Sequence, residues 1–168
     1  MPCESRTMTT TWNDVEAAQP DLAGRIRARF EATGLALVAT VRADGSPRIS
    51  GWEPLFDLGQ LWLGSMPDSR KGKDARRDPR IALHAATADK DVKDGDAKIS
   101  GRAVLVTDDA ERQAYAQAFK EDNEMDVPTP FDLFRVEIAE ISMLRPAGDH
   151  LVIEWWRPGE ELHRIERR

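Results

Sequence analysis

Cysteine and long apolar runs are the scarcest features of this sequence. Its 168 residues include one cysteine, Cys3, so no disulfide can form within the chain. A lone cysteine is typical of proteins from reducing compartments. The start of the chain lacks the apolar core of a signal peptide, and no run reaches the about 20 apolar residues of a membrane span. We therefore expect a cytoplasmic protein that does not enter a membrane.

Common catalytic and metal-binding motifs are also missing. The sequence has no GxSxG, HExxH or Walker pattern, which argues against the usual serine hydrolase, zinc protease and P-loop sites. The three histidines, His84, His150 and His163, do not have the spacing of metal ligands. We expect no metal site, and the motifs identify no catalytic side chain.

The balance of charges limits the partners. The chain has 24 Lys and Arg against 30 Asp and Glu, a net charge of −6. Such a surface repels nucleic acids and anionic membranes, so we expect neither as a partner. An anionic small molecule would need a local cluster of cations.

The chain opens with helical patterns. Asn13 and Glu16 have the spacing of a helix cap, and apolar residues then recur at three- and four-residue steps as far as Phe30. Pro20 predicts that a first helical piece ends near Ala18 and that a second helix begins at its first turn. Further helices are expected over Ser69–Asp78 and Asp109–Glu124.

Seven segments have the pattern of β-strands. They are Leu35–Val41, Arg48–Phe56, Leu61–Ser65, Arg80–Ala86, Ala97–Thr107, Leu133–Arg145 and Leu151–Arg157. Asp44-Gly45 predicts a tight hairpin, and short loops make the first three strands an antiparallel meander. Pro54 indicates a bulge or an unpaired edge. A bulge near Ala139–Glu140 would keep the apolar residues of the sixth strand on one face.

These elements predict a mainly β protein with flanking helices, built as an antiparallel barrel of six or seven strands. We expect one domain over residues 13–168, a flexible N-terminal extension over residues 1–12, and a charged tail after Pro158-Gly159. The apolar run Leu35–Val41 predicts a buried strand, so that replacing Leu37 or Val38 would destabilise the protein.

One segment, Met66–Leu83, is strongly basic. From Arg70 to Arg80 it has six cations and two carboxylates, a net charge of +4. The cations are Arg70, Lys71, Lys73, Arg76, Arg77 and Arg80. Ser69 stands at the expected helix N-terminus, where amide groups and the helix dipole favour an anion. Hydroxyl, Lys and Arg donors together suit a phosphate. The alternative is an ordinary solvated helix.

The segments LALVATVRADGSPRISGWEPLF and LWLGSMPDSRKGKDARRDPRIALH resemble the FMN-binding split-barrel family, the relatives of pyridoxamine 5'-phosphate oxidase. The resemblance covers roughly Trp12 to Arg157. Its parts are an opening helix, an apolar strand, a DGxP hairpin, an aromatic strand and a basic segment that ends in Pro-Arg. It implies a split β-barrel of the FMN-binding type. It also implies a homodimer with each cofactor in a groove between two barrels.

The same resemblance suggests which residues meet the cofactor. Arg48, Ile49, Ser50 and Gly51 would run beside the ring, Gly64, Ser65 and Met66 would line the groove, and Ser69, Arg70, Lys71 and Lys73 would hold the phosphate. The glycines at positions 51 and 64 would let a flat ring approach the backbone.

The implied function is that of a flavin- or deazaflavin-dependent oxidoreductase, a reductase rather than an oxidase. Such an enzyme would transfer a hydride between the cofactor and an unsaturated or carbonyl small molecule. The C-terminal stretch lacks the substrate-binding pattern of the vitamin B6 oxidase. The Arg-, Ala- and Asp-rich composition, the meander and the WRPG ending resemble the actinobacterial branch, where several members use the deazaflavin F420 in place of FMN. Extra cations at Arg76, Arg77 and Lys98 suit the longer anionic tail of F420. Water, Ser50 or Glu53 would supply a proton.

Two other functions stay open. Some split-barrel relatives bind haem, so the chain could be a non-catalytic flavin or haem carrier, with His84 as the ligand. It could also be a pyridoxamine phosphate oxidase-type FMN oxidase, which would form hydrogen peroxide.

Overall fold

A computed structural model describes residues 9–168, so Cys3 and most of the expected N-terminal extension lie outside the described residues. The last part of that stretch is packed rather than loose. Trp12 begins the first helix and is 1% exposed. The carbonyl oxygen of Thr10 accepts a hydrogen bond from the Ile138 amide at 2.9 Å. The barrel domain therefore begins before residue 13.

The opening helices are α1 (Trp12–Ala18) and α2 (Pro20–Glu31), which confirms the break at Pro20. The cap is different from the one expected. Thr11 and Asp14 form a reciprocal capping box, in place of Asn13 and Glu16, because α1 begins at Trp12. The other helices are α3 (Arg70–Arg77) and α4 (Asp109–Asn123). None of the helices in the described part of the chain is long and apolar enough to cross a membrane.

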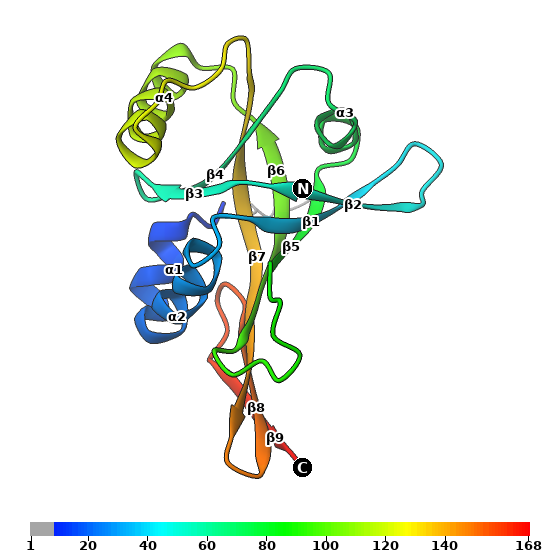
Figure 1. Ribbon diagram of the computed structural model, residues 1–168, viewed down its shortest axis with the longest axis vertical. Coiled ribbons are helices and arrows are strands. Elements are labelled where there is room, and N and C mark those ends of the chain that lie inside the picture. Colours follow the sequence, from blue (N-terminus) through cyan, green and yellow to red (C-terminus); the bar gives the residue numbers. More distant parts are fainter. Residues whose placement is uncertain (1–8) are drawn as a thin grey trace, which may run out of the picture.

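Nine strands form one antiparallel sheet, where six or seven were expected. They are β1 (Ala36–Val41), β2 (Pro47–Trp52), β3 (Pro54–Asp57), β4 (Gln60–Ser65), β5 (Arg80–Ala85), β6 (Asp96–Leu105), β7 (Asp132–Ala147), β8 (His150–Trp156) and β9 (His163–Arg167). The expected strand Arg48–Phe56 divides at Glu53, just before Pro54, which cannot donate to a ladder. The charged tail forms β9, which pairs with β8 and projects from the barrel with it (Figure 1).

The order of strands explains the barrel. Along the sheet it is β2-β1-β5-β6-β7-β4-β3, so β2 and β3, neighbours in sequence, lie at opposite ends of the path. The indole nitrogen of Trp52 on β2 donates to the carbonyl oxygen of Gly64 on β4 at 2.6 Å, which draws the two ends together. The expected three-strand meander is therefore wrong. Two hairpins, β1–β2 and β3–β4, take its place.

The bulge expected in the sixth strand is confirmed in β7. Ser100 of β6 lies opposite Glu140, and Gly101 opposite Ile138, so Ala139 has no partner on β6. A Cβ at Gly101 would lie 2.1 Å from the carbonyl oxygen of Glu137. Glycine is required there because the bulge brings the β7 backbone too close for any side chain.

Strand β1 is buried on one face only. Ala36 and Val38 are fully buried, but Leu37 is 42% exposed and Ile49, on the neighbouring β2, is 74% exposed. The prediction that Leu37 lies in the core is wrong, because alternate side chains of a strand point to opposite faces. The large core lies inside the barrel and under α1 and α2. A smaller cluster of Trp62, Val106, Tyr115 and Leu133 lies under α4.

Candidate functional site

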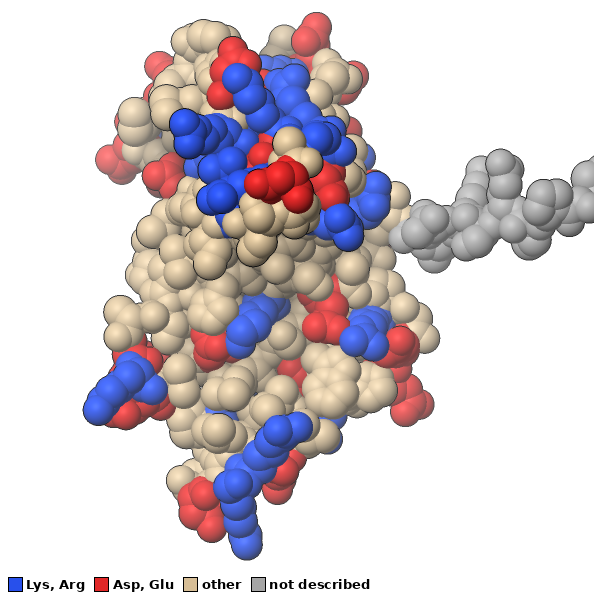
Figure 2. Space-filling model, turned by 90° about the vertical axis from the view of Figure 1, so that its right-hand side faces the viewer, with Lys and Arg blue, Asp and Glu red and all other residues tan. Residues whose placement is uncertain are grey.

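A basic cleft lies between α3 and the β1–β2 hairpin. It has a volume of about 400 Å³ and is lined by Arg42, Ala43, Asp44, Arg48, Arg70, Lys73, Asp74 and Arg77. These side chains carry five positive and two negative charges, a net charge of +3. Figure 2 shows Lys and Arg gathered at one end of this side of the molecule, above a broad area with few charged side chains. The cleft is the kind of local cluster that an anion needs in a protein of net charge −6.

Asp74 organises the cations of the cleft. Asp74 is 4% exposed, and its carboxylate accepts hydrogen bonds from Thr40 at 3.0 Å, Arg48 at 2.6 Å and Arg77 at 3.1 Å. Burial acts to raise the pKa of Asp74, but the bonds from Arg48, Arg77 and Thr40 outweigh it and hold that pKa below its usual value. The two arginines are thus held in fixed positions, while Arg70 is exposed beside them.

The N-terminus of α3 is capped by Ser69. Its hydroxyl oxygen accepts from the Gly72 amide at 3.0 Å and shares a hydrogen bond of 2.7 Å with the Ser65 hydroxyl. A Cβ at Gly72 would lie 2.9 Å from this oxygen, so glycine permits the tight cap. When Ser65 is the donor, the Ser69 proton is free to bind a ligand oxygen.

Lys71 connects α3 to strand β2. Its ammonium donates to the carbonyl oxygen of Gly51 at 2.6 Å and lies 5.0 Å from the centre of the Trp52 ring. Burial lowers the pKa of Lys71, although the negative charge of Glu53 opposes this. The bonds Lys71–Gly51, Trp52–Gly64 and Ser65–Ser69 tie residues 48–51, 64–66 and 69–73 into one unit.

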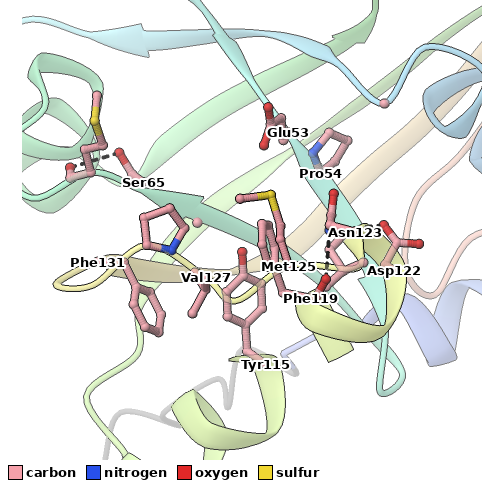
Figure 3. Close-up of a pocket in the computed structure, with 15 residues that line it drawn as sticks. Glu53, Pro54, Ser65, Tyr115, Phe119, Asp122, Asn123, Met125, Val127 and Phe131 are labelled. Atoms are coloured by element: carbon pink, nitrogen blue, oxygen red, sulfur yellow. Dashed lines mark hydrogen bonds between the residues drawn. The ribbon is translucent and has the colours of Figure 1, made fainter. Parts of the chain in front are cut away.

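A second cavity of about 460 Å³ lies under α4, next to the same unit (Figure 3). Gly64, Ser65 and Met66 form one wall. The other lining residues are Gly34, Glu53, Pro54, Leu55, Tyr115, Phe119, Asp122, Asn123, Met125, Val127, Pro128 and Phe131. A Cβ at Gly64 would lie 2.3 Å from the Tyr115 hydroxyl oxygen. Glycine at position 64 therefore makes room for the tyrosine.

A third hollow lies on the outer face of the sheet. Leu37, Ile49, His84 and Lys98 are among its lining residues. Both ring nitrogens of His84 have partners, the carbonyl oxygen of Ala85 at 2.6 Å and the Asp96 carboxylate at 2.9 Å. Within residues 9–168, no group of three or more His, Cys, Asp or Glu side chains is placed to hold a metal ion.

Comparison with known proteins identifies the family. A family model described as pyridoxamine 5'-phosphate oxidase matches residues 22–145. The chain belongs to this family. A comparison with curated proteins finds no match.

Solved members of the same fold are distant in sequence. A pyridoxamine 5'-phosphate oxidase-related, FMN binding protein from Nostoc punctiforme is 13% identical over 89% of this chain and 96% of its own, with a TM-score of 0.63. PhzG from Burkholderia lata, solved with tetrahydrophenazine-1-carboxylic acid, is 14% identical over 94% of this chain and 95% of its own (TM-score 0.59). A heme binding protein from Mycobacterium smegmatis is 18% identical over 79% of this chain and 57% of its own (TM-score 0.58). The fold is therefore the split barrel of the pyridoxamine 5'-phosphate oxidase family.

The residues that the sequence predicted to bind the cofactor lie in different places in the structure. Arg48, Arg70 and Lys73 line the basic cleft, whereas Gly64, Ser65 and Met66 line the cavity under α4. Ile49 points to the outer face, because β2 alternates its side chains. Ser50 is half-buried in β2, and Gly51 is exposed on the edge of the sheet.

Some expected cations lie elsewhere. Lys98 pairs with Asp96 on the outer face, and Arg76 pairs with Asp132, so neither lines the basic cleft, whereas Arg77 does. The sequence did not point to Arg42 or Tyr115, and it marked Asp74 only as an opposing charge. A signal existed for Asp74, because it is an acidic residue inside a run of cations.

Proposed function

We propose that this member of the pyridoxamine 5'-phosphate oxidase family is an oxidoreductase that uses a deazaflavin (F420) or FMN. It would transfer a hydride between the cofactor and an unsaturated or carbonyl small molecule, acting as a reductase. The observation that carries the proposal is the basic cleft. The cleft has a net charge of +3. Hydrogen bonds connect the elements that form it to the edge of β2 and to Gly64.

The cleft fits the phosphate of such a cofactor. Arg70 and Lys73 are exposed on the first turn of α3, and Arg48 is held between the cleft and Asp74. With the Ser69 hydroxyl, they would bind phosphate oxygens through charge-assisted hydrogen bonds. When bound, the cofactor supplies the hydride chemistry.

The edge of β2 fits a flat ring. In the described part of the chain, β2 pairs with β1 and with no other strand, so half of its backbone groups face outward. Gly51 has no side chain to keep a ring away from that edge. The Lys71 ammonium would position the Gly51 carbonyl group that borders it.

The number of cations favours the deazaflavin. Arg42 and Arg77 extend the positive lining beyond Arg48, Arg70 and Lys73, so the cleft gathers five cations. A longer tail with several negative groups would use all five. Glu53 lies between β2 and β3 and is exposed, so it and Ser50 are the side chains that we propose as proton carriers, with water as the alternative.

We also propose a homodimer with the cofactor at its interface. The outer face exposes Leu37 (42%) and Ile49 (74%), and both line the hollow on that face. A partner barrel would cover these apolar residues.

The carrier function is a weaker candidate. It draws support from the fold that the chain shares with the heme binding protein from Mycobacterium smegmatis. However, iron ligation by His84 would break its bond to Asp96 or to the Ala85 carbonyl group. A Soret band that is lost in His84→Ala would support the carrier, and an unchanged spectrum would remove it.

The first experiment is a titration of the purified chain with FMN and with F420, following ring fluorescence. Tight binding of F420 alone supports a deazaflavin-dependent reductase. Tight binding of FMN alone supports a flavin enzyme, and hydrogen peroxide formed from pyridoxamine phosphate would then indicate the oxidase. Binding of neither cofactor would overturn the proposal.

A further inference from the structure

The cavity under α4 has a lining that is opposite in charge to the basic cleft. Its charged residues are Glu53 and Asp122, and Lys, Arg and His are missing from the set of described residues that line it. The rest of the lining is largely apolar and aromatic, with Leu55, Phe119 and Phe131 among its members. A cavity of about 460 Å³ has the size and polarity of a site for a small organic molecule.

Tyr115 is the central polar side chain of this cavity. Its ring is fixed against Trp62, Phe119 and Phe131, with centroid distances of 6.1, 6.0 and 5.8 Å. The residue is 3% exposed. Figure 3 shows it rising from α4 with its hydroxyl group directed into the cavity.

The Tyr115 hydroxyl group is available to a ligand. The hydrogen bonds drawn among the cavity residues of Figure 3 involve Asn123 and Ser65, and none of them involves Tyr115. Burial, with a further contribution from the negative charge of Glu53, raises the pKa of Tyr115 to about 12. The hydroxyl group therefore keeps its proton at neutral pH and can donate it in a hydrogen bond.

We propose that the cavity under α4 binds a flat, largely apolar molecule that has no negative charge and accepts a hydrogen bond from the Tyr115 hydroxyl group. Aromatic walls suit a planar ring. Glu53 and Asp122 attract a cation, tolerate a neutral molecule and repel a carboxylate or phosphate. The aromatic walls, the charge preference and the donated hydrogen bond together define the class: aromatic ketones, enones and imines.

The binding of such a molecule in the cavity does not depend on the proposed function. Only its role as the substrate rests on the proposed function. Gly64 and Ser65 belong both to the cavity wall and to the unit that borders the basic cleft, so a ligand there would lie near the proposed ring. The basic cleft would then select the anionic cofactor, and the neighbouring cavity, with its two carboxylates, would select the non-anionic substrate.

The charge preference is tested by calorimetric titration of the full chain without cofactor. The probes are naphthylmethylammonium and naphthoate, which share one ring system and differ in charge. We expect the cation to bind roughly threefold or more tightly than the anion. The double variant Glu53→Gln, Asp122→Asn should remove this preference. Glu121→Gln, a neighbour on α4 that does not line the cavity, should keep it. Equal or tighter binding of naphthoate would overturn the inference.

The hydrogen bond is tested with two uncharged probes of the same shape, acetonaphthone and ethylnaphthalene. Tyr115→Phe should weaken acetonaphthone binding roughly fivefold and leave ethylnaphthalene binding unchanged. An equal change for both probes would contradict a role for the hydroxyl group. Met125→Trp changes an exposed residue of the cavity wall and should block the binding of all four probes. Unchanged probe binding in this variant would overturn the cavity as their binding site.

The two proposals fail in different ways. Probe binding without F420 or FMN binding would overturn the proposed function and support the cavity. Cofactor binding with no probe bound would overturn the cavity and leave the proposed function standing.

Discussion

The Lys71 ammonium group lies 2.6 Å from the carbonyl oxygen of Gly51, so a side chain of the basic helix holds the exposed edge of the sheet. Replacing Lys71 by Met keeps its length and removes its charge. We expect cofactor affinity to fall roughly tenfold, because the Gly51 carbonyl group beside the proposed ring loses the charge-assisted hydrogen bond that positions it. The melting temperature should change little, since burial already disfavours the charged form of Lys71. Lys90→Met, in the exposed loop before β6, is the control, and equal affinities for the two variants would argue against the site.

Asp74→Asn should destabilise the protein by roughly 2–4 kcal/mol at pH 7, because Arg48 and Arg77 lose a buried counter-charge. The pKa of Asp74 is lowered on folding from 3.8, so its contribution is present above that value and is lost as the pH falls through its folded pKa. Denaturant unfolding from pH 7 to pH 2 should therefore show the two proteins converging in acid. Asp68→Asn, an exposed carboxylate near Lys73, should have almost no effect. A constant gap at every pH would contradict this account.

Two glycine substitutions should have opposite effects on the stability of the protein. A Cβ at Gly101 would meet the Glu137 carbonyl oxygen, whereas a Cβ at Gly24 in α2 would meet nothing within 4 Å. We expect Gly101→Ala to cost roughly 3 kcal/mol or more. Gly24→Ala should stabilise the protein by about 0.5–1 kcal/mol, because alanine favours a helix interior. Thermal unfolding of both variants checks this, and a mild effect at Gly101 would show that the bulge can shift.

Tyr115 is the one tyrosine of the chain, so absorbance of the phenolate reports it alone. Its pKa should be about 12 in the folded protein, against about 10 in the unfolded chain. Because the folded value is the higher one, the stability from this group is complete below pH 10 and is lost as the pH rises towards 12. Titration in the presence and absence of denaturant measures both values, and Tyr115→Phe gives the baseline. A folded midpoint near 10 would show that the ring is more open to water than the structure indicates.

The two faces of β1 should respond differently to truncation. Val38 is fully buried and Leu37 is 42% exposed. We expect Val38→Ala to destabilise a protomer by roughly 2 kcal/mol and Leu37→Ala by less than about 1 kcal/mol. Denaturant unfolding at low protein concentration makes the comparison. Similar losses would show that the outer face of the sheet is also packed.

Local patterns in the sequence were enough to predict most of the elements. Pro20 marked the start of α2, the apolar runs marked seven strands, and a break in alternation marked the bulge that the structure places at Ala139. These features depend on neighbours along the chain, through backbone geometry and the spacing of apolar side chains. Strand β9 was missed because its residues are all exposed, so it has no apolar pattern and depends on pairing with β8.

For the candidate site too, some features could be predicted from the sequence and others depend on the folded chain. The charge of the segment from Arg70 to Arg80, its cap at Ser69 and its fitness for an anion could be read from the residues alone, since charge and hydrogen-bonding groups belong to each side chain. Which cations share one cleft could not. Asp74 binds Arg48, which is 26 residues away in the sequence, whereas Asp96 holds Lys98 and Asp132 holds Arg76 outside the cleft. The meeting of Tyr115 with Gly64 was likewise decided only by the folded chain, because α4 and β4 come together through packing between elements that are far apart in sequence.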